Sequence, residues 1–340
     1  MKKNVFTGTI IIIVFVALNI LFSPSSPITS STLVTASEEI DSVKNQTALD
    51  KIPSKKIYED MQSFNLSSSE TMKASLTTEA TEKFDEELYS ELANLLGNNI
   101  NKIGLVYYNL TTKEYVTINE NMDFDAASTY KVGLNLLYYY YADKGEVDLS
   151  SLLTYYDYFY QDGTGILYGY CYSGMEISIQ ELLDLSIIYS DNIATAILSN
   201  YLGGYNSVRE QLYSLLNIDY VLYENLLTPA ISAQILKYVY DNRELSGFNH
   251  LIDTMKITIF HERLDKYIPN NLVAHKIGSI DSYVHDIGFV FTDEPYIISI
   301  YTEGIYNAEK TIASMSKVIY NKHTESITQF SINKTIYDKY

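Results

Sequence analysis

Apolar residues adopt a helical period shortly after residue 80. In the stretch TEKFDEELYSELANLLG, Phe84, Leu88 and Leu92 recur at helical spacing, and Gly97 supplies a stop. The next two runs, KIGLVYYNL and EYVTINE, are rich in β-branched and aromatic residues and are separated by TTK, a pattern that predicts a β-hairpin. We therefore expect one helix followed by two antiparallel strands.

Helical periodicity dominates the middle of the chain. It begins after Ser128 and continues through residues 179–201, 207–216 and 229–240. Strand patterns return at NLVAHKIG, DIGFVFTD and YIISIYTEG, and a last helix is predicted from Asn307 to Tyr320. Strands at both ends with helices between them predict one α+β unit, in which the terminal strands share an antiparallel sheet.

The chain opens with a different pattern. Lys2 and Lys3 precede an apolar run from Thr9 to Phe22, which is the layout of a secretory signal. We expect residues 1–28 to be a signal peptide or an uncleaved N-terminal membrane anchor, because the small-residue cleavage site after Ala36 lies far beyond the apolar run. Both alternatives predict an exported protein, extracellular or at the cell surface, that meets the membrane only through this segment.

Composition divides the rest of the chain into three parts. Residues 29–78 are rich in Ser, Thr, Lys and Glu and poor in aromatic residues, which predicts a disordered linker. The folded domain is expected to span residues 79–321, and residues 322–340 are expected to form a polar C-terminal tail.

Charge and metal-ligand content argue against several functions. The formal net charge is −18, from 24 basic and 42 acidic residues, so nucleic acid is not expected as a partner. The five histidines are scattered, and HERLD at 261–265 lacks the second histidine of a zinc-binding helix motif. We expect no metal, no cofactor and a monomer.

Two residue types occur in unusual numbers. There are 33 tyrosines, including YYYY at 138–141 and YYDYFY at 155–160; packing explains most of them, and a surface that stacks on sugars or bases is the alternative. The single cysteine, Cys171, excludes an intrachain disulfide. We interpret it as a buried small residue rather than a reactive thiol, because no basic residue lies beside it.

A serine three residues before a lysine places both side chains on one helical face, where proton transfer between them is possible. Only one of the three S-x-x-K occurrences lies where a strand and loop lead into a helix, so that the helix dipole favours a developing oxyanion. That occurrence is Ser128/Lys131; the others are Ser314/Lys317, inside a predicted helix, and Ser331/Lys334, in the tail.

Two further motifs follow in order: SDN at 190–192 and KIG at 276–278. Taken singly, SDN fits a polar helix face and Lys276 fits a charge that protects a strand edge. Taken together, S-x-x-K, S-D-N and K-x-G resemble the active-site-serine penicillin-recognising enzymes, most closely class A β-lactamases. The resemblance covers residues 79–321 and implies a five-stranded antiparallel sheet packed on an all-helical lobe.

The resemblance also implies roles for the motif residues. Ser128 corresponds to the acylated nucleophile, Lys131 to its base, and Ser190 to the relay that carries a proton to the leaving nitrogen. Lys276 corresponds to the cation that supports Ser190 and the substrate.

The resemblance assigns further positions to substrate binding. Asn192 corresponds to the residue that holds the substrate's side-chain amide, and Gly278 and Ser279 belong to the strand that lines the substrate. The backbone N–H groups of Ser128 and Ser279 correspond to the family's oxyanion hole.

The third motif departs from the family pattern at Ile277, which replaces a hydroxyl residue that binds the substrate's carboxylate and offers neither donor nor acceptor. His285 lies near the place where the family often has a carboxylate-binding arginine. It is expected either to bind the carboxylate when protonated or to be a structural strand histidine.

The second departure is a missing omega loop. Class A β-lactamases carry a Glu-x-x-Leu-Asn signature whose glutamate activates the deacylating water, and no such signature lies between Ser190 and Pro229. The nearest carboxylate, Glu224, is either a replacement or a surface residue ahead of a helix. We expect a serine hydrolase that accumulates its acyl-enzyme, acting on a β-lactam or on an amide like that of a peptidoglycan stem peptide. The alternative is a non-catalytic binding module of the same fold at the cell wall.

Overall fold

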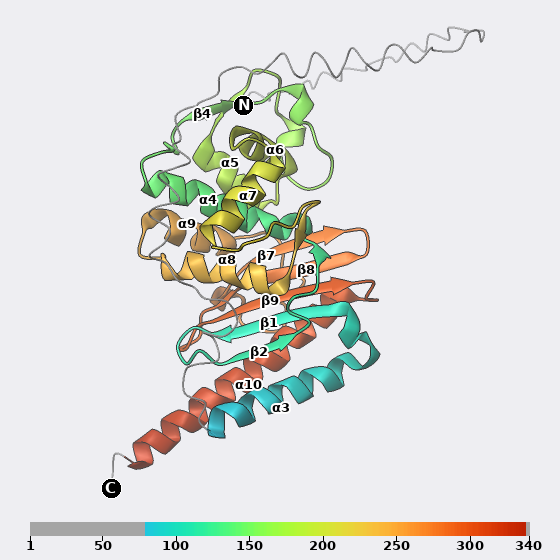
Figure 1. Ribbon diagram of the computed structural model, residues 1–340, viewed down its shortest axis with the longest axis vertical. Coiled ribbons are helices and arrows are strands. Elements are labelled where there is room, and N and C mark those ends of the chain that lie inside the picture. Colours follow the sequence, from blue (N-terminus) through green and yellow to red (C-terminus); the bar gives the residue numbers. More distant parts are fainter. Residues whose placement is uncertain (1–78, 338–340) are drawn as a thin grey trace, which may run out of the picture. The chain divides into compact units, whose positions relative to one another are not determined.

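The computed structural model describes residues 79–337, and its centre is a five-stranded antiparallel sheet of order β2-β1-β9-β8-β7 (Figure 1). The first hairpin, from the beginning of the domain, pairs with the last strand, so the predicted shared sheet is confirmed. The five strands are β1 (Ile103–Asn109), β2 (Tyr115–Ile118), β7 (Val273–Ile280), β8 (Tyr283–Val290) and β9 (Tyr296–Glu303).

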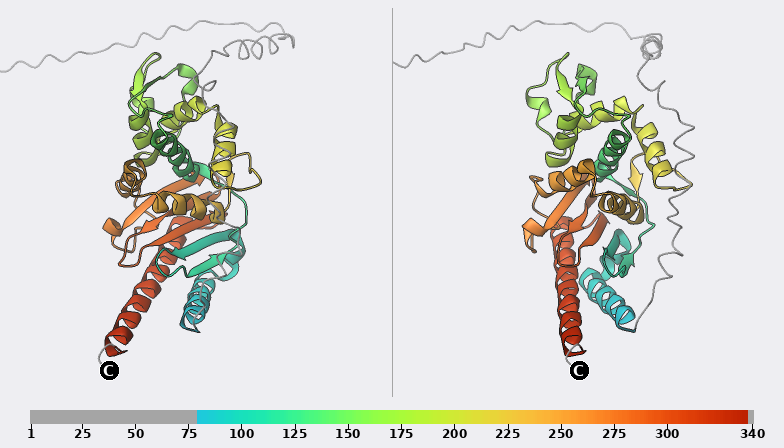
Figure 2. Two further views of the ribbon diagram at one scale, coloured as in Figure 1. Left: turned by 60° about the vertical axis from the view of Figure 1, so that its left-hand side comes forward. Right: turned by 90° about the vertical axis from the view of Figure 1, so that its left-hand side faces the viewer.

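Successive side chains of β1 point to opposite faces of the sheet, and each face has its own hydrophobic core. Leu105 and Tyr107 pack with the first and last helices, α3 (Glu79–Leu96) and α10 (Ala308–Tyr337), whereas Val106 and Tyr108 face the helical lobe. Figure 2 shows α3 and α10 on one side of the sheet and the remaining helices on the other. The predicted α+β architecture is therefore observed.

The helical lobe surrounds a nearly fully buried central helix, α4. Short strand pairs that the sequence did not predict join its loops: β3 (Phe124–Asp125) with β6 (Leu226–Leu227), and β4 (Leu152–Thr154) with β5 (Glu176–Ser178). Its helices are α4 (Lys131–Asp143), α5 (Ile179–Ile188), α6 (Asn192–Tyr201), α7 (Tyr205–Leu215), α8 (Pro229–Asp241) and α9 (Ser246–Lys256).

The predicted end of the last helix at Tyr320 is wrong, because α10 continues to Tyr337. His323, in the expected tail, is fully buried and shares a 2.8 Å hydrogen bond with the hydroxyl of Tyr107 on β1. This contact extends the packed part of the domain beyond residue 321. Cys171 also differs from its prediction, since it is half-buried rather than buried.

The tyrosines divide into two groups. Buried ones such as Tyr138 and Tyr213 build the core, as predicted. A second group is exposed along residues 156–172 at one end of the lobe: Tyr156, Tyr158, Tyr160, Tyr168, Tyr170 and Tyr172.

The predicted leader (residues 1–28) and linker (residues 29–78) lie outside the described residues. Within residues 79–337, no helix combines the length and the apolar character that a membrane span requires.

Candidate active site

Ser128 lies in a short 3-10 helix, η4 (Ala127–Tyr130), that leads directly into α4. The Asp125 carboxylate accepts the N–H of Ala127 at 2.9 Å, and the N–H of Ala126 donates to the carbonyl of Asn225 at 2.8 Å. Ala127 itself adopts a φ of +47°, a left-handed conformation that is uncommon outside glycine. These contacts hold the half-buried Ser128 at the beginning of a long helix, as its sequence context predicted.

Lys131 is almost fully buried, with 2% of its surface exposed. Its Nζ donates to the Ser190 carbonyl at 2.7 Å, to Ser190 Oγ at 3.2 Å and to Asn192 Oδ1 at 2.8 Å. Burial lowers the pKa of Lys131 to about 7, although the nearby Asp191 carboxylate acts in the opposite direction. A lysine with this pKa is partly neutral at neutral pH and is therefore suited to accept a proton.

The Ser190 hydroxyl lies between two buried lysines. It accepts a hydrogen bond from Lys276 Nζ at 2.9 Å as well as the one from Lys131. Burial lowers the pKa of Lys276 well below its usual value, and the neighbouring Lys131 and Arg263 charges lower it further. Ser190 has a φ of +53° and is itself buried, so its hydroxyl is held in one place between the two lysine amines.

Asp191 shapes the loop that carries Ser190. One carboxylate oxygen caps α6 through the N–H of Ala194, and the other accepts the N–H groups of Ile166 and Leu167. Gly165 must be glycine, because its φ is +131° and an added Cβ would lie 2.3 Å from Asp191 Oδ2. The DGTGIL segment is thereby attached to the SDN motif.

Asn192 uses both ends of its side-chain amide inside the protein. Oδ1 accepts the bond from Lys131, and Nδ2 donates to the carbonyl of Asp162 at 2.8 Å. The structure therefore places Asn192 beside Lys131 at the edge of the site, with one amide hydrogen and one lone pair left for a ligand.

Strand β7 brings the third motif to the serine. Gly278 passes so close to η4 that an added Cβ would lie 2.8 Å from the carbonyl oxygen of Ala126. Ser279 follows it as an exposed residue, and Ile277 is half-buried. Because β7 is the edge of the sheet, alternate N–H groups along it face away from β8, as an oxyanion hole requires.

Arg263 is a site residue that sequence reasoning missed. It is 3% exposed and donates through Nη1 to the carbonyls of Gly278 and His285, and through Nη2 to Ser279 Oγ at 2.5 Å. In the sequence, HERLD shows only an incomplete metal motif, and its arginine shortly before the strand of the KIG motif is the available signal. Arg263 places a positive charge directly behind the exposed Ser279 hydroxyl.

The predicted role of His285 as a carboxylate ligand is contradicted. The ring is fully buried; its Nε2–H donates to the carbonyl of Asp125 at 2.7 Å, and its Nδ1 accepts the N–H of Thr302 at 3.1 Å. Burial lowers the pKa of His285 to about 3, and the nearby Arg263 also acts against protonation. The neutral ring is the structural strand histidine of the second alternative.

The short loop before α8 contacts the turn of the nucleophile. The Asn225 amide donates to Asp125 Oδ1 at 2.9 Å and to the Ala127 carbonyl at 3.2 Å, and its oxygen accepts from Arg209. Glu224 precedes it as an exposed residue with a φ of +57°. The Asn225 side chain therefore joins the loop to the turn of the nucleophile, while Glu224 lies at the surface.

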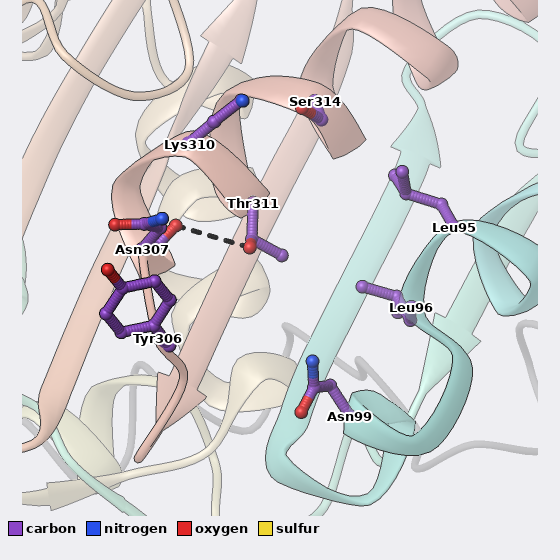
Figure 3. A pocket seen from close by; sticks show the side chains of 8 residues that line it. All are labelled: Leu95, Leu96, Asn99, Tyr306, Asn307, Lys310, Thr311 and Ser314. Atoms are coloured by element: carbon purple, nitrogen blue, oxygen red, sulfur yellow. Dashed lines mark hydrogen bonds between the residues drawn. The ribbon is translucent and has the colours of Figure 1, made fainter.

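The second S-x-x-K motif lies far from this cluster. Ser314 borders a cavity of about 250 Å³ between α3 and α10, and its lysine, Lys317, is exposed (Figure 3). None of the residues that line this cavity belongs to the SDN or KIG motifs: Leu95, Leu96, Asn99, Tyr306, Asn307, Lys310, Thr311 and Ser314.

A protein-family model and curated proteins both match this chain over most of the described residues. The model of the beta-lactamase enzyme family matches residues 87–323. Among curated proteins, the extended-spectrum beta-lactamase PER-1 of Pseudomonas aeruginosa is 23% identical over 264 residues, covering 68% of this chain and 85% of PER-1.

Solved structures give the same fold. PBP-A, in a mutant form described as an acyl-enzyme complex with penicillin G, superposes with a TM-score of 0.65 at 22% identity, covering 71% of this chain and 97% of PBP-A. The TLA-1 extended-spectrum beta-lactamase superposes with a TM-score of 0.63 at 25% identity, covering 70% of this chain and 98% of TLA-1.

Proposed function

This chain belongs to the beta-lactamase enzyme family, and we propose that it is an exported serine hydrolase that is acylated at Ser128 and releases the acyl group slowly. The acyl donor is a β-lactam or an amide like that of a peptidoglycan stem peptide. The observation that carries this proposal is the Ser190 hydroxyl, which accepts hydrogen bonds from both buried lysines beside the Ser128 turn.

Acylation begins with the neutral form of Lys131. Its amine takes the hydroxyl proton of Ser128 while Oγ forms a bond to the carbonyl carbon of the substrate. When the carbon–nitrogen bond breaks, Ser190 gives its proton to the leaving nitrogen and receives one from Lys131. The result is an ester on Ser128, a protonated leaving group and a lysine that is neutral again.

In the structure without substrate, Lys131 donates its three hydrogen bonds to Ser190 and Asn192, and none of them to Ser128. Loss of one lysine proton removes one of these donors and leaves a lone pair for the serine. Catalytic hydrogen bonds often form fully only when substrate is bound, so this arrangement is compatible with Lys131 as the base.

Substrate carboxylate recognition is assigned to Ser279 in place of His285. Its hydroxyl is exposed and accepts from the buried Arg263, so its own proton is free to point toward a ligand. The guanidinium behind it, which also pairs with the exposed Glu309 carboxylate at 3.4 Å, adds positive charge for an anion on the strand that carries Ile277.

Slow deacylation follows from the residues near the ester. Asn225 fastens the shortened loop to Asp125 and Ala127, while Glu224 is exposed. An exposed carboxylate is poorly suited to hold and activate one buried water for attack on the acyl-enzyme. The acyl-enzyme form in which PBP-A was solved supports an accumulating ester in a protein of this fold.

The test is intact mass spectrometry of the purified full-length protein mixed with benzylpenicillin and followed over minutes to hours. We expect a drug-sized mass increment that persists, disappears in Ser128→Ala and remains in the matched control Ser314→Ala. Glu224→Gln should leave the adduct's lifetime unchanged. Absence of an adduct together with unchanged drug would favour the non-catalytic binding module, and rapid Ser128-dependent loss of the drug would refute slow release.

Export is proposed from the sequence, since Lys2 and Lys3 precede the apolar run from Thr9 to Phe22. Cell fractionation of the expressed protein should recover it outside the cytoplasm, and the mass of its N-terminal peptide distinguishes a cleaved leader from an anchor. Recovery in the cytoplasm with an intact N-terminus would contradict export.

A further inference from the structure

A second cluster of polar side chains lies behind strand β7, apart from the serine site. His261 and Asp265 come from the loop that follows α9, and His275 comes from β7 itself. One ligand atom from each residue lies within 4.8 Å of the other two. HERLD lacks a second histidine at helical spacing, but the fold supplies one from a strand.

Two atoms of this cluster are buried without a hydrogen-bond partner. They are Nε2 of His275, a residue that is 1% exposed, and Oδ1 of Asp265, which is 5% exposed. His275 Nε2 lies 3.7 Å from Asp265 Oδ2, which is within ion-pair distance but too long for a hydrogen bond. A buried donor or acceptor that is left unpaired costs free energy, so this gap calls for a third group.

The opposite side of the His275 ring is already held. Both oxygens of the Asp286 carboxylate lie within 2.9 Å of Nδ1, and Asp286 also accepts the N–H of Leu264. A carboxylate on one ring nitrogen fixes the orientation of the ring and directs the other nitrogen outward, which is how metal-binding histidines are usually supported.

We propose that His261, Asp265 and His275 bind a divalent transition-metal ion of the zinc class, with Asp286 as the supporting carboxylate. Two imidazoles and one carboxylate are ligands that zinc favours, and bond lengths of about 2.0–2.2 Å place tetrahedral ligands about 3.3 Å apart. At present Asp265 Oδ2 lies 2.5 Å from His261 Nδ1 and 3.7 Å from His275 Nε2, and all three ligand atoms lie within 4.8 Å of one another, so the ligands must shift to reach this spacing. His261, whose side chain is 52% exposed, is free to adjust.

Such an ion would join the loop after α9 to the sheet. The same loop carries Arg263, which holds Gly278 and Ser279 at the substrate edge of β7. Metal binding is therefore expected to stabilise the domain and the edge strand. The proposal does not depend on the activity proposed for Ser128.

The test uses full-length protein without a polyhistidine tag, stripped with EDTA and titrated with Zn²⁺ against a chromophoric chelator. We expect one equivalent to bind, and the melting temperature to rise by about 5 °C or more at a hundredfold excess over Kd. His261→Ala should weaken binding at least about tenfold. Because this substitution also removes the partner of the buried Asp265 carboxylate, the Zn²⁺-dependent rise of each protein is measured from its own melting temperature in EDTA.

The matched control is His250→Ala, which removes another exposed histidine that lies 2.8 Å from a carboxylate, Asp184, but belongs to no three-residue cluster within the described part of the chain. It should bind Zn²⁺ like the wild type. Asp265→Asn provides a second variant at the site and should also weaken binding. Absence of any Zn²⁺-dependent rise in melting temperature, or an equal rise in wild type and His261→Ala, would overturn the proposal.

Discussion

Burial of Lys131 makes the stability of the domain depend on pH in a way that can be measured. The pKa of this lysine is about 7 in the folded protein against an ordinary value of 10.5. Between these two values the unfolded chain binds more protons than the native protein, so the free energy of unfolding rises with pH. Lys131→Met keeps an apolar stem of similar length and removes the titrating group.

The size of the effect follows from the displacement of the pKa. Each pH unit between the two pKa values adds about 1.4 kcal/mol to the free energy of unfolding. Below the folded pKa the free energy of unfolding no longer changes with pH through this lysine. Between about pH 6 and pH 9, the free energy of unfolding of the wild type should therefore rise by about 2.5 kcal/mol more than that of Lys131→Met. Taking the difference at each pH cancels most of the contribution of titrating groups that are distant from Lys131. Lys276 is the exception, because the Lys131 charge lowers its pKa and is absent from the variant.

Urea denaturation followed by far-ultraviolet circular dichroism at pH 6, 7, 8 and 9 measures this difference. Lys317→Met, which removes an exposed lysine of α10, serves as the surface control. If the difference between wild type and Lys131→Met stayed constant across this range, the lysine would not be held at a lowered pKa, and the reasoning that makes it a base would fail.

Two further predictions concern acylation. The acylation rate should rise about tenfold between pH 6 and pH 8 as Lys131 loses its proton, measured as adduct formation by rapid-quench mass spectrometry; a flat profile would contradict this. Gly278→Ala should slow acylation and lower the free energy of unfolding by about 1–3 kcal/mol, because the new Cβ meets the Ala126 carbonyl at 2.8 Å. In Gly169→Ala the added Cβ meets nothing within 4 Å, so equal effects of the two substitutions would argue against the close approach as the cause.

The sheet was predictable because alternation and β-branched runs mark its long strands. The two-residue strands β3 and β6 were not, since Phe124–Asp125 and Leu226–Leu227 are too short to show any period. The end of α10 was missed for another reason: residues beyond Tyr320 are mostly polar, and the segment packs on the sheet through His323, whose ring contacts Tyr107 and Tyr296.

At the candidate active site, the order of the motifs predicted which residues lie together but not their surroundings. His285 pairs with Gly278 across β7 and β8, so its side chain shares a face with the substrate strand, as a carboxylate ligand would need. The turn at Asp125 covers that position, and such coverage by a distant loop leaves no pattern in the sequence. The surroundings of Arg263 and the grouping of His261, Asp265 and His275 also leave no pattern in the sequence, because both depend on a loop and strands that only the fold brings together.

The position of β1 in the sheet has a consequence for how the chain folds. β1 lies between its hairpin partner and β9, with Ile103 paired to Thr302, so its second edge stays open until β9 has been synthesised. Pairings of such long sequence separation form slowly because a large loop must close first. A growing chain that has not yet reached β9 therefore has an unfinished sheet whose backbone N–H and C=O groups along one edge of β1 are still unpaired.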